Sequence, residues 1–199
     1  MKRIGLLLAV LAVALGAAAA GGLKVPKVGK PAPRFSLVDS DGKVRSLAGE
    51  KGKFVVLEWT DHTCPYVGKH YDSGNMQRLQ RTYTAKGVTW FSILSSAEDT
   101  AEQAGKDVER LKASPTAVLL DKDGGLARRY GVANTPTLYV VDPKGVLIYG
   151  GAIDDIRSTD IEDVARAKNY VAKALDEAMA GKPVATAVTK PYGCPLGHE

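Results

Sequence analysis

The sequence is poor in the residues that most often build disulfide frameworks or bind transition metals. Its 199 residues include two cysteines and three histidines. Two cysteines are too few for a small scaffold stapled by several disulfides, and a chain of this length can bury a core without one. Any sulfur chemistry must therefore use Cys64 or Cys194.

Long apolar runs are also scarce, and the one near the N-terminus is short. Lys2 and Arg3 precede an uncharged run over 4–15, and a Gly/Ala stretch follows it. A basic start, an apolar centre and small residues are the parts of a secretory signal peptide. The run falls short of the ~20 residues that a membrane-spanning helix needs. We therefore expect a bacterial-type signal peptide over 1–20, cleaved near Ala20, and a periplasmic or secreted protein. An uncleaved leader that anchors the chain to a membrane is the alternative.

Neither sign of charge dominates the chain. The net charge is +5, and it falls to +3 when Lys2 and Arg3 leave with the leader. Lysine and glutamate are interspersed, without the basic stripe that a nucleic-acid-binding face requires. The composition therefore predicts an ordinary solvated surface and no nucleic-acid partner.

After the leader, the pattern divides into an extended lead-in over 21–34, a domain over 35–181 and a tail over 182–199. Apolar runs bounded by turn residues predict strands, and longer amphipathic runs predict helices. The expected strands are 35–38, 44–47, 54–57, 88–94, 117–120, 137–141 and 146–149, and the expected helices are 66–86, 98–113 and 161–180. The order predicts an α/β fold, with an N-terminal β-hairpin and a central mixed sheet covered by helices on both faces.

Cys64 stands between the strand over 54–57 and the helix that follows it. A sulfur at this junction faces unpaired helix amides and the positive end of the helix dipole, which favour the thiolate. Pro65 fits the first helical turn, where its missing N–H costs nothing. A buried structural thiol is the alternative, but strand-to-helix junctions are where α/β proteins place their sites. We therefore expect Cys64 to be reactive.

Thr135-Pro136 opens the strand over 137–141. An X-Pro bond in this place favours the otherwise uncommon cis isomer. An ordinary proline that leads into a strand is the alternative.

Together these features resemble the thioredoxin superfamily, and within it the redoxin group of alkyl hydroperoxide reductases and thiol-specific antioxidant proteins. The resemblance covers roughly 30–181 and rests on Cys64-Pro65-Tyr66-Val67, on Glu58 and on Thr135-Pro136. It implies a thioredoxin-like fold in which Cys64 is the nucleophile. It also implies that Glu58 relays a proton to the partner thiol, and that Thr135 and Pro136 form a cis-proline loop facing the sulfur.

Two departures from the family pattern bear on the substrate. Val67 replaces the second cysteine of the thioredoxin C-x-x-C motif. Asp61 stands three residues before Cys64, where peroxiredoxins carry a hydroxyl that hydrogen-bonds the peroxide. An ionised aspartate cannot donate, and its charge opposes thiolate formation unless a protonated His62 offsets it. The resemblance thus implies an antioxidant oxidoreductase that reduces hydroperoxides or disulfides through Cys64, uses an external dithiol as reductant and needs no cofactor.

Cys194 lies on the tail, past the last expected helix. Some peroxiredoxins keep a resolving cysteine on a C-terminal tail, and Cys194 looks similar. A static Cys64–Cys194 disulfide and an unrelated thiol are the alternatives. We expect mild peroxide to join the two cysteines, within one chain or across a dimer.

The other interpretation is a binding protein that catalyses no reaction. Sco-type copper-delivery proteins share the thioredoxin fold, and soft sulfur and imidazole ligands suit copper. His62, Cys64, Cys194 and His198 could converge if the tail folds back, although the second cysteine of the Sco C-x-x-x-C motif is absent. Copper binding or partner binding is therefore the alternative function.

Overall fold

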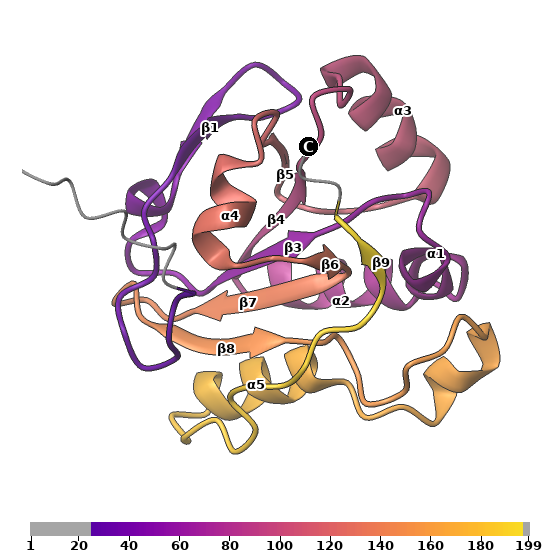
Figure 1. The fold of residues 1–199 in the computed structure, drawn as a ribbon. Coiled ribbons are helices and arrows are strands. Elements are labelled where there is room, and N and C mark those ends of the chain that lie inside the picture. The colour runs from indigo at the N-terminus through magenta and orange to yellow at the C-terminus, as the bar shows by residue number, and fades with distance from the viewer. Residues whose placement is uncertain (1–24, 197–199) are drawn as a thin grey trace, which may run out of the picture.

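A five-stranded mixed sheet, in the order β5–β4–β3–β7–β8, forms the centre of the computed structural model, which describes residues 25–196 (Figure 1). Strand β3 pairs parallel with β4 and antiparallel with β7. The strands are β1 (Ser36–Val38), β2 (Val44–Ser46), β3 (Val55–Trp59), β4 (Thr89–Leu94), β5 (Ala117–Leu120), β6 (Asn134–Thr135), β7 (Thr137–Val141), β8 (Leu147–Gly151) and β9 (Cys194–Pro195). The helices are α1 (Pro65–Asp72), α2 (Asn75–Thr84), α3 (Ala101–Leu111), α4 (Gly125–Tyr130) and α5 (Tyr170–Met179), with short 3₁₀ helices at Leu47–Glu50 and Ile161–Ala165.

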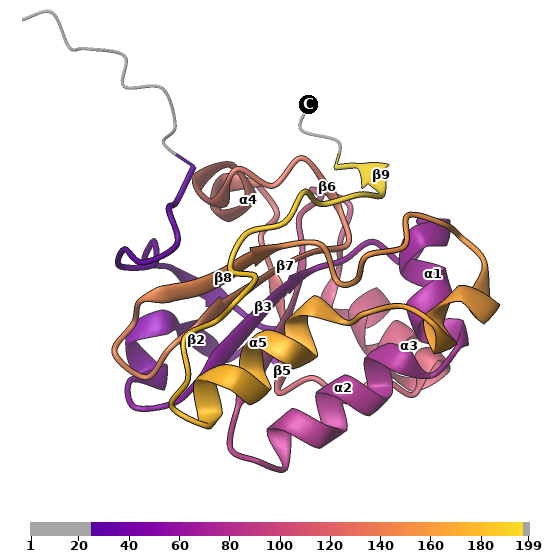
Figure 2. The same cartoon turned by 90° about the horizontal axis from the view of Figure 1, so that it is seen from below.

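Two apolar cores lie on the two faces of this sheet, because successive strand residues point to opposite sides. Val56 of β3 packs toward helices α1, α2 and α5, whereas Val55 and Leu57 pack toward α4 and the β1–β2 hairpin (Figure 2). The expected α/β class, the thioredoxin-like mixed sheet and the N-terminal hairpin are therefore confirmed.

Two of the expected helices are each broken in two. The helix predicted over 66–86 ends at Asp72 and restarts at Asn75, because Gly74 adopts a left-handed φ of +69° that interrupts the helix. The helix predicted over 161–180 is a short 3₁₀ turn followed by α5. Asn169 starts α5 anew, since its side chain accepts a hydrogen bond from the backbone N–H of Ala172 at 2.8 Å.

The sequence pattern gave no indication of helix α4. The stretch Asp121–Gly124 is a turn after β5, and its first residue also caps the helix that follows. The Asp121 carboxylate accepts hydrogen bonds from the N–H groups of Leu126 and Ala127, both at 2.9 Å. The turn that ends β5 therefore also starts α4, which packs on the sheet face opposite to α1, α2 and α5.

None of the expected strands lies in the tail, yet the tail does form one. Its chain follows the edge of the sheet at β8, where Gly150 donates to Ala187 O and accepts from Thr189 N, both at 3.1 Å. It then forms β9, which pairs antiparallel with β6 (Figure 1). These bonds bring the end of the tail to the same edge of the sheet as Cys64.

The lead-in also packs against the sheet. Gly29 N donates to Leu147 O at 2.8 Å and Ala32 N donates to Gly145 O at 2.9 Å, so this segment covers the end of the β7–β8 hairpin. The expected leader over 1–20 lies outside the described residues. Within 25–196, no helix combines the length and the apolar character needed to cross a membrane.

Candidate functional site

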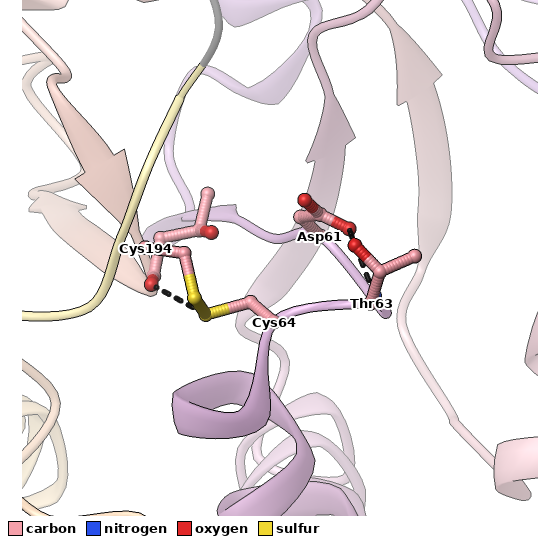
Figure 3. Close-up of a disulfide and its surroundings, with 5 residues drawn as sticks. Asp61, Thr63, Cys64 and Cys194 are labelled. Atoms are coloured by element: carbon pink, nitrogen blue, oxygen red, sulfur yellow. Dashed lines mark hydrogen bonds between the residues drawn. A yellow bond between two sulfur atoms is a disulfide. The ribbon is translucent and has the colours of Figure 1, made fainter.

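Cys64 lies at the N-terminus of helix α1, at the end of the loop that follows β3. Asp61 shapes this loop, because its carboxylate accepts from Thr63 N at 2.8 Å and from Thr63 Oγ1 at 2.7 Å (Figure 3). Cys64 N then donates to Asp61 O at 3.0 Å, and Cys64 becomes the N-cap residue with Pro65 as the first helical residue. The local geometry is the one that favours a thiolate at a helix N-terminus.

The second sulfur comes from the tail. Cys64 and Cys194 form a disulfide across 130 residues of sequence, with their Cα atoms 5.8 Å apart (Figure 3). Of the three sequence-based alternatives for Cys194, an unrelated thiol is therefore excluded. Val67 stands where a C-x-x-C motif would place its second cysteine, so the second sulfur of this disulfide comes from another element, β9.

The cis-proline loop holds both cysteines in place. The Thr135–Pro136 peptide bond is cis, as the sequence predicted. Thr135 pairs with Cys194 in the β6–β9 ladder, and its carbonyl oxygen lies 3.4 Å from Cys64 Sγ. The predicted juxtaposition of Cys64 with Thr135 and Pro136 is thus present, with the tail strand added to it.

A buried polar cluster fixes the tail just before Cys194. The hydroxyl of Tyr192, a residue only 6% exposed, donates to Asp154 and accepts from Lys69 Nζ and His70 Nε2, both at 3.4 Å. Lys69 and His70 belong to α1, the helix that Cys64 caps. The Tyr192 ring also packs edge-on against Tyr66, with 5.8 Å between ring centroids.

The charges in this cluster are balanced. Lys69 Nζ lies 3.5 Å from Asp154 Oδ2 and donates to Ile156 O at 2.8 Å. Burial and the neighbouring Lys69 lower the pKa of His70 to about 3, so its imidazole is neutral at physiological pH. Asn75 donates its amide N–H to His70 Nδ1 at 2.9 Å, which leaves the proton on Nε2, facing Tyr192.

The sequence analysis did not identify this cluster as part of the site. A signal was present, because Lys69 and His70 fall on the inward side of α1 beside Tyr71, where apolar residues are expected. The partner, Tyr192, follows α1 by more than a hundred residues, so no local pattern connects the two.

Glu58 lies fully buried on β3, below the sulfur-bearing loop. Its carboxylate accepts hydrogen bonds from Tyr71 Oη, Gln80 Nε2, Trp90 Nε1 and Ser92 Oγ at 2.7–3.1 Å. Burial raises the pKa of Glu58, while these four donors act in the opposite direction without reversing the shift. Its carboxyl is thus a fixed group with an altered proton affinity, as a relay would need; the relay role itself stays a prediction.

His62 does not offset the charge of Asp61. Burial lowers the pKa of His62, so its imidazole is neutral near pH 7. Beside it, a hollow of about 510 Å³ opens between the loops after β3 and β4, and its lining includes Asp61, Thr63 and Leu196. Thr63 precedes Cys64 and Leu196 follows Cys194 by two residues, so the hollow flanks the disulfide.

The four residues considered for copper are not assembled in the part of the chain that the structure describes. Cys64 and Cys194 are bonded to each other, and His198 lies outside residues 25–196. Within that range, no group of three or more His, Cys, Asp or Glu side chains is arranged to hold a metal ion.

Comparisons with known proteins agree with this geometry. Residues 28–150 match the AhpC/TSA family. The thiol-disulfide oxidoreductase ResA of Bacillus thuringiensis subsp. konkukian is 31% identical over 122 residues, which cover 61% of this chain and 68% of ResA. An uncharacterized conserved protein from Geobacillus kaustophilus superimposes with a TM-score of 0.75 at 29% identity, over 87% of this chain and 93% of that one. The thioredoxin domain of a thiol-disulfide oxidoreductase from Bacteroides vulgatus shares the fold, with a TM-score of 0.54 at 22% identity over 70% of this chain and 96% of that one.

Proposed function

The chain belongs to the AhpC/TSA family, and from this we propose that it is an exported thiol–disulfide oxidoreductase whose redox centre is the Cys64–Cys194 pair. One observation carries the proposal: the disulfide joins a helix N-cap to a tail strand beside the cis-proline loop. The likeness to ResA, a protein named as a thiol-disulfide oxidoreductase, supports the same chemistry.

The reaction exchanges one disulfide for another. Oxidised chain and an external dithiol give the reduced chain and an oxidised partner; the reduced chain then converts a substrate disulfide to two thiols and regains its own disulfide. Cys64 supplies the stabilised thiolate, because it caps helix α1. We assign Glu58 the role of relaying a proton beneath the pair, on the basis of its burial and raised pKa.

Hydroperoxides are the second substrate class that we propose, and the AhpC/TSA match supports it. The Cys64 thiolate would attack the peroxide oxygen, giving a sulfenic acid and releasing an alcohol or water. Cys194 would then attack that sulfur and release water as the disulfide forms. In the disulfide form Cys64 is only 2% exposed, so this route requires the tail to move in the reduced chain. We therefore rank disulfide exchange first.

Export follows from the first residues, with Lys2 and Arg3 before the apolar run. A compartment outside the cytoplasm keeps protein cysteines oxidised unless a dedicated dithiol reduces them. The partner is accordingly an external dithiol protein. Cell fractionation with mass determination of the chain tests this point, and a chain found in the cytoplasm with Met1 retained would contradict it.

The test of the proposed function is turnover by the cysteine variants. We expect the wild-type chain to catalyse the reduction of a peptide disulfide by dithiothreitol, and we expect Cys64→Ser and Cys194→Ser each to abolish this catalysis. Both variants lose the disulfide and some stability, so folding is checked by circular dichroism and urea titration alongside wild type in dithiothreitol. Wild-type turnover by either folded variant would refute the two-cysteine centre. Hydrogen peroxide consumption by the same three proteins tests the second substrate class.

A further inference from the structure

The two cysteine residues of the disulfide are unequally exposed. Cys64 is 2% exposed, and its Sγ faces the carbonyl oxygen of Thr135 at 3.4 Å. Cys194 is partly exposed, and the next residue, Pro195, is exposed. A molecule that approaches from solvent therefore meets the tail cysteine first.

The tail covers Cys64 because it is held on both sides of the disulfide. Before it, Tyr192 is bonded to Asp154 and packed on Tyr66. At Gly193 the backbone passes so close to Thr135 that a Cβ would stand 1.7 Å from its carbonyl oxygen. After it, Leu196 N donates to Ala133 O at 3.0 Å. These contacts involve residues other than the two cysteines. The position of the tail over Cys64 therefore does not depend on the disulfide alone.

From this geometry we propose that an external thiol enters the redox cycle at Cys194, and that Cys64 is the leaving group. The inference rests on the proposed function. The entering thiolate attacks Cys194 Sγ and forms a new disulfide with it. The Cys64–Cys194 bond breaks, and its electron pair leaves with Cys64 as thiolate. The second thiolate of the external dithiol then attacks the partner sulfur of the mixed disulfide and releases Cys194, which takes up a proton.

The two cysteines also differ as leaving groups. Thiol–disulfide exchange is faster when the departing sulfur is the better-stabilised thiolate. Cys64 caps helix α1, whose N-terminal amides and dipole stabilise negative charge. Cys194 belongs to a two-residue strand and is not itself a helix N-cap residue. Accessibility and leaving-group stability therefore select the same direction of attack.

The reverse reaction follows the same path. When the reduced chain acts on a substrate disulfide, Cys194 makes the first bond to the substrate, and Cys64 then attacks Cys194 to release it. For disulfide substrates this order differs from the sequence-based expectation, in which Cys64 attacks first and Cys194 resolves.

Capture of oxidised glutathione by the single-cysteine variants tests the order. We expect reduced Cys64→Ser, with Cys194 available, to form a glutathione mixed disulfide at least about tenfold faster than reduced Cys194→Ser, whose remaining thiol lies under the tail. Adding Tyr192→Ala to Cys194→Ser frees the tail, and we expect it to restore capture at Cys64. Equal or faster capture by Cys194→Ser, or no gain on adding Tyr192→Ala, would overturn the proposal.

A second measurement uses the wild-type chain. Oxidised chain is mixed with substoichiometric reduced glutathione, quenched with acid within milliseconds, alkylated and mapped by peptide mass. We expect glutathione on Cys194 and the alkyl group on Cys64; the opposite labelling would assign entry to Cys64. A wild-type disulfide that neither glutathione nor dithiothreitol reduces would instead refute the proposed function itself.

Discussion

Tyr192 and Asp154, 38 residues apart in sequence, are joined by a buried hydrogen bond that fixes the tail two residues before Cys194. Asp154 is in turn paired with Lys69, on the helix that carries Cys64 at its N-cap. The two halves of the disulfide are therefore connected a second time, through polar side chains that do not take part in sulfur chemistry.

Removing the Tyr192 hydroxyl should weaken this second connection. Tyr192→Phe keeps the ring packed on Tyr66 but leaves Asp154, Lys69 and His70 with one partner fewer, at a cost of about 1–3 kcal/mol. We expect the equilibrium with glutathione to shift toward the reduced chain by about tenfold, since tenfold corresponds to about 1.4 kcal/mol. Tyr170→Phe is the matched control. If both variants show the wild-type redox equilibrium with glutathione, the cluster does not position Cys194.

Loss of the buried cation should be far more costly than loss of an exposed one. Lys69→Met leaves the Asp154 carboxylate, 2% exposed, without its cation, and we expect a loss of about 3–5 kcal/mol in the free energy of unfolding. Lys43→Met breaks a solvent-exposed ion pair with Asp41 and should change the free energy of unfolding by less than about 0.5 kcal/mol. Urea titration of both variants measures the difference. A similar effect of the two substitutions would argue against a buried ion pair.

The stability of the chain should fall on mild acidification because of His70. Its pKa is about 3 in the folded chain, against an ordinary value of 6.5, so below pH 6.5 the unfolded chain binds a proton that the folded chain does not. The contribution of His70 to the free energy of unfolding is complete above pH 6.5. It is lost as the pH falls toward 3, at up to about 1.4 kcal/mol per pH unit. Unfolding titrations between pH 7 and pH 5 measure the slope. His70→Gln should flatten it, and an unchanged slope in that variant would assign the effect to other groups.

A side chain at Gly193 should displace the tail. Gly193 has a φ of +138°, and a Cβ there would collide with the carbonyl oxygen of Thr135. We expect Gly193→Ala to raise the rate at which Cys64 is alkylated in the folded, reduced chain and to shift the disulfide toward reduction by about tenfold or more. Gly105→Ala, in an open position on α3, is the control and should leave both readouts unchanged. Protection of Cys64 in Gly193→Ala equal to wild type would contradict a tightly docked tail.

The sheet and the position of Cys64 could be predicted from the sequence because their signals are local. The runs over 54–57, 88–94 and 117–120 are mostly apolar and lie between turn residues, and each forms a strand of the five-stranded sheet. The cis bond at Thr135–Pro136 was also expected, but from the family resemblance, because its place before a strand left an ordinary proline as the alternative.

The tail could not be predicted in the same way. Its docking depends on Tyr192 meeting Asp154 and α1, and on Gly193 passing Thr135, which are contacts between segments far apart in the chain. The break of the first long helix needed only Gly74, yet the apolar periodicity continues across it. Local patterns thus located Cys64 at the start of a helix, whereas the position of its disulfide partner emerged only from tertiary packing.

The central claim is that the Cys64–Cys194 disulfide is redox-active rather than static, and one cycle of thiol labelling tests it most directly. The purified oxidised chain is treated with dithiothreitol, freed of it, and then given a peptide disulfide, with alkylation and mass measurement at each stage. The account predicts no alkylatable cysteine at the start, two after reduction, and none once the peptide disulfide has been reduced to thiols in equal amount. A disulfide that stays closed in dithiothreitol, or two cysteines that stay reduced in the presence of the peptide disulfide, would contradict it.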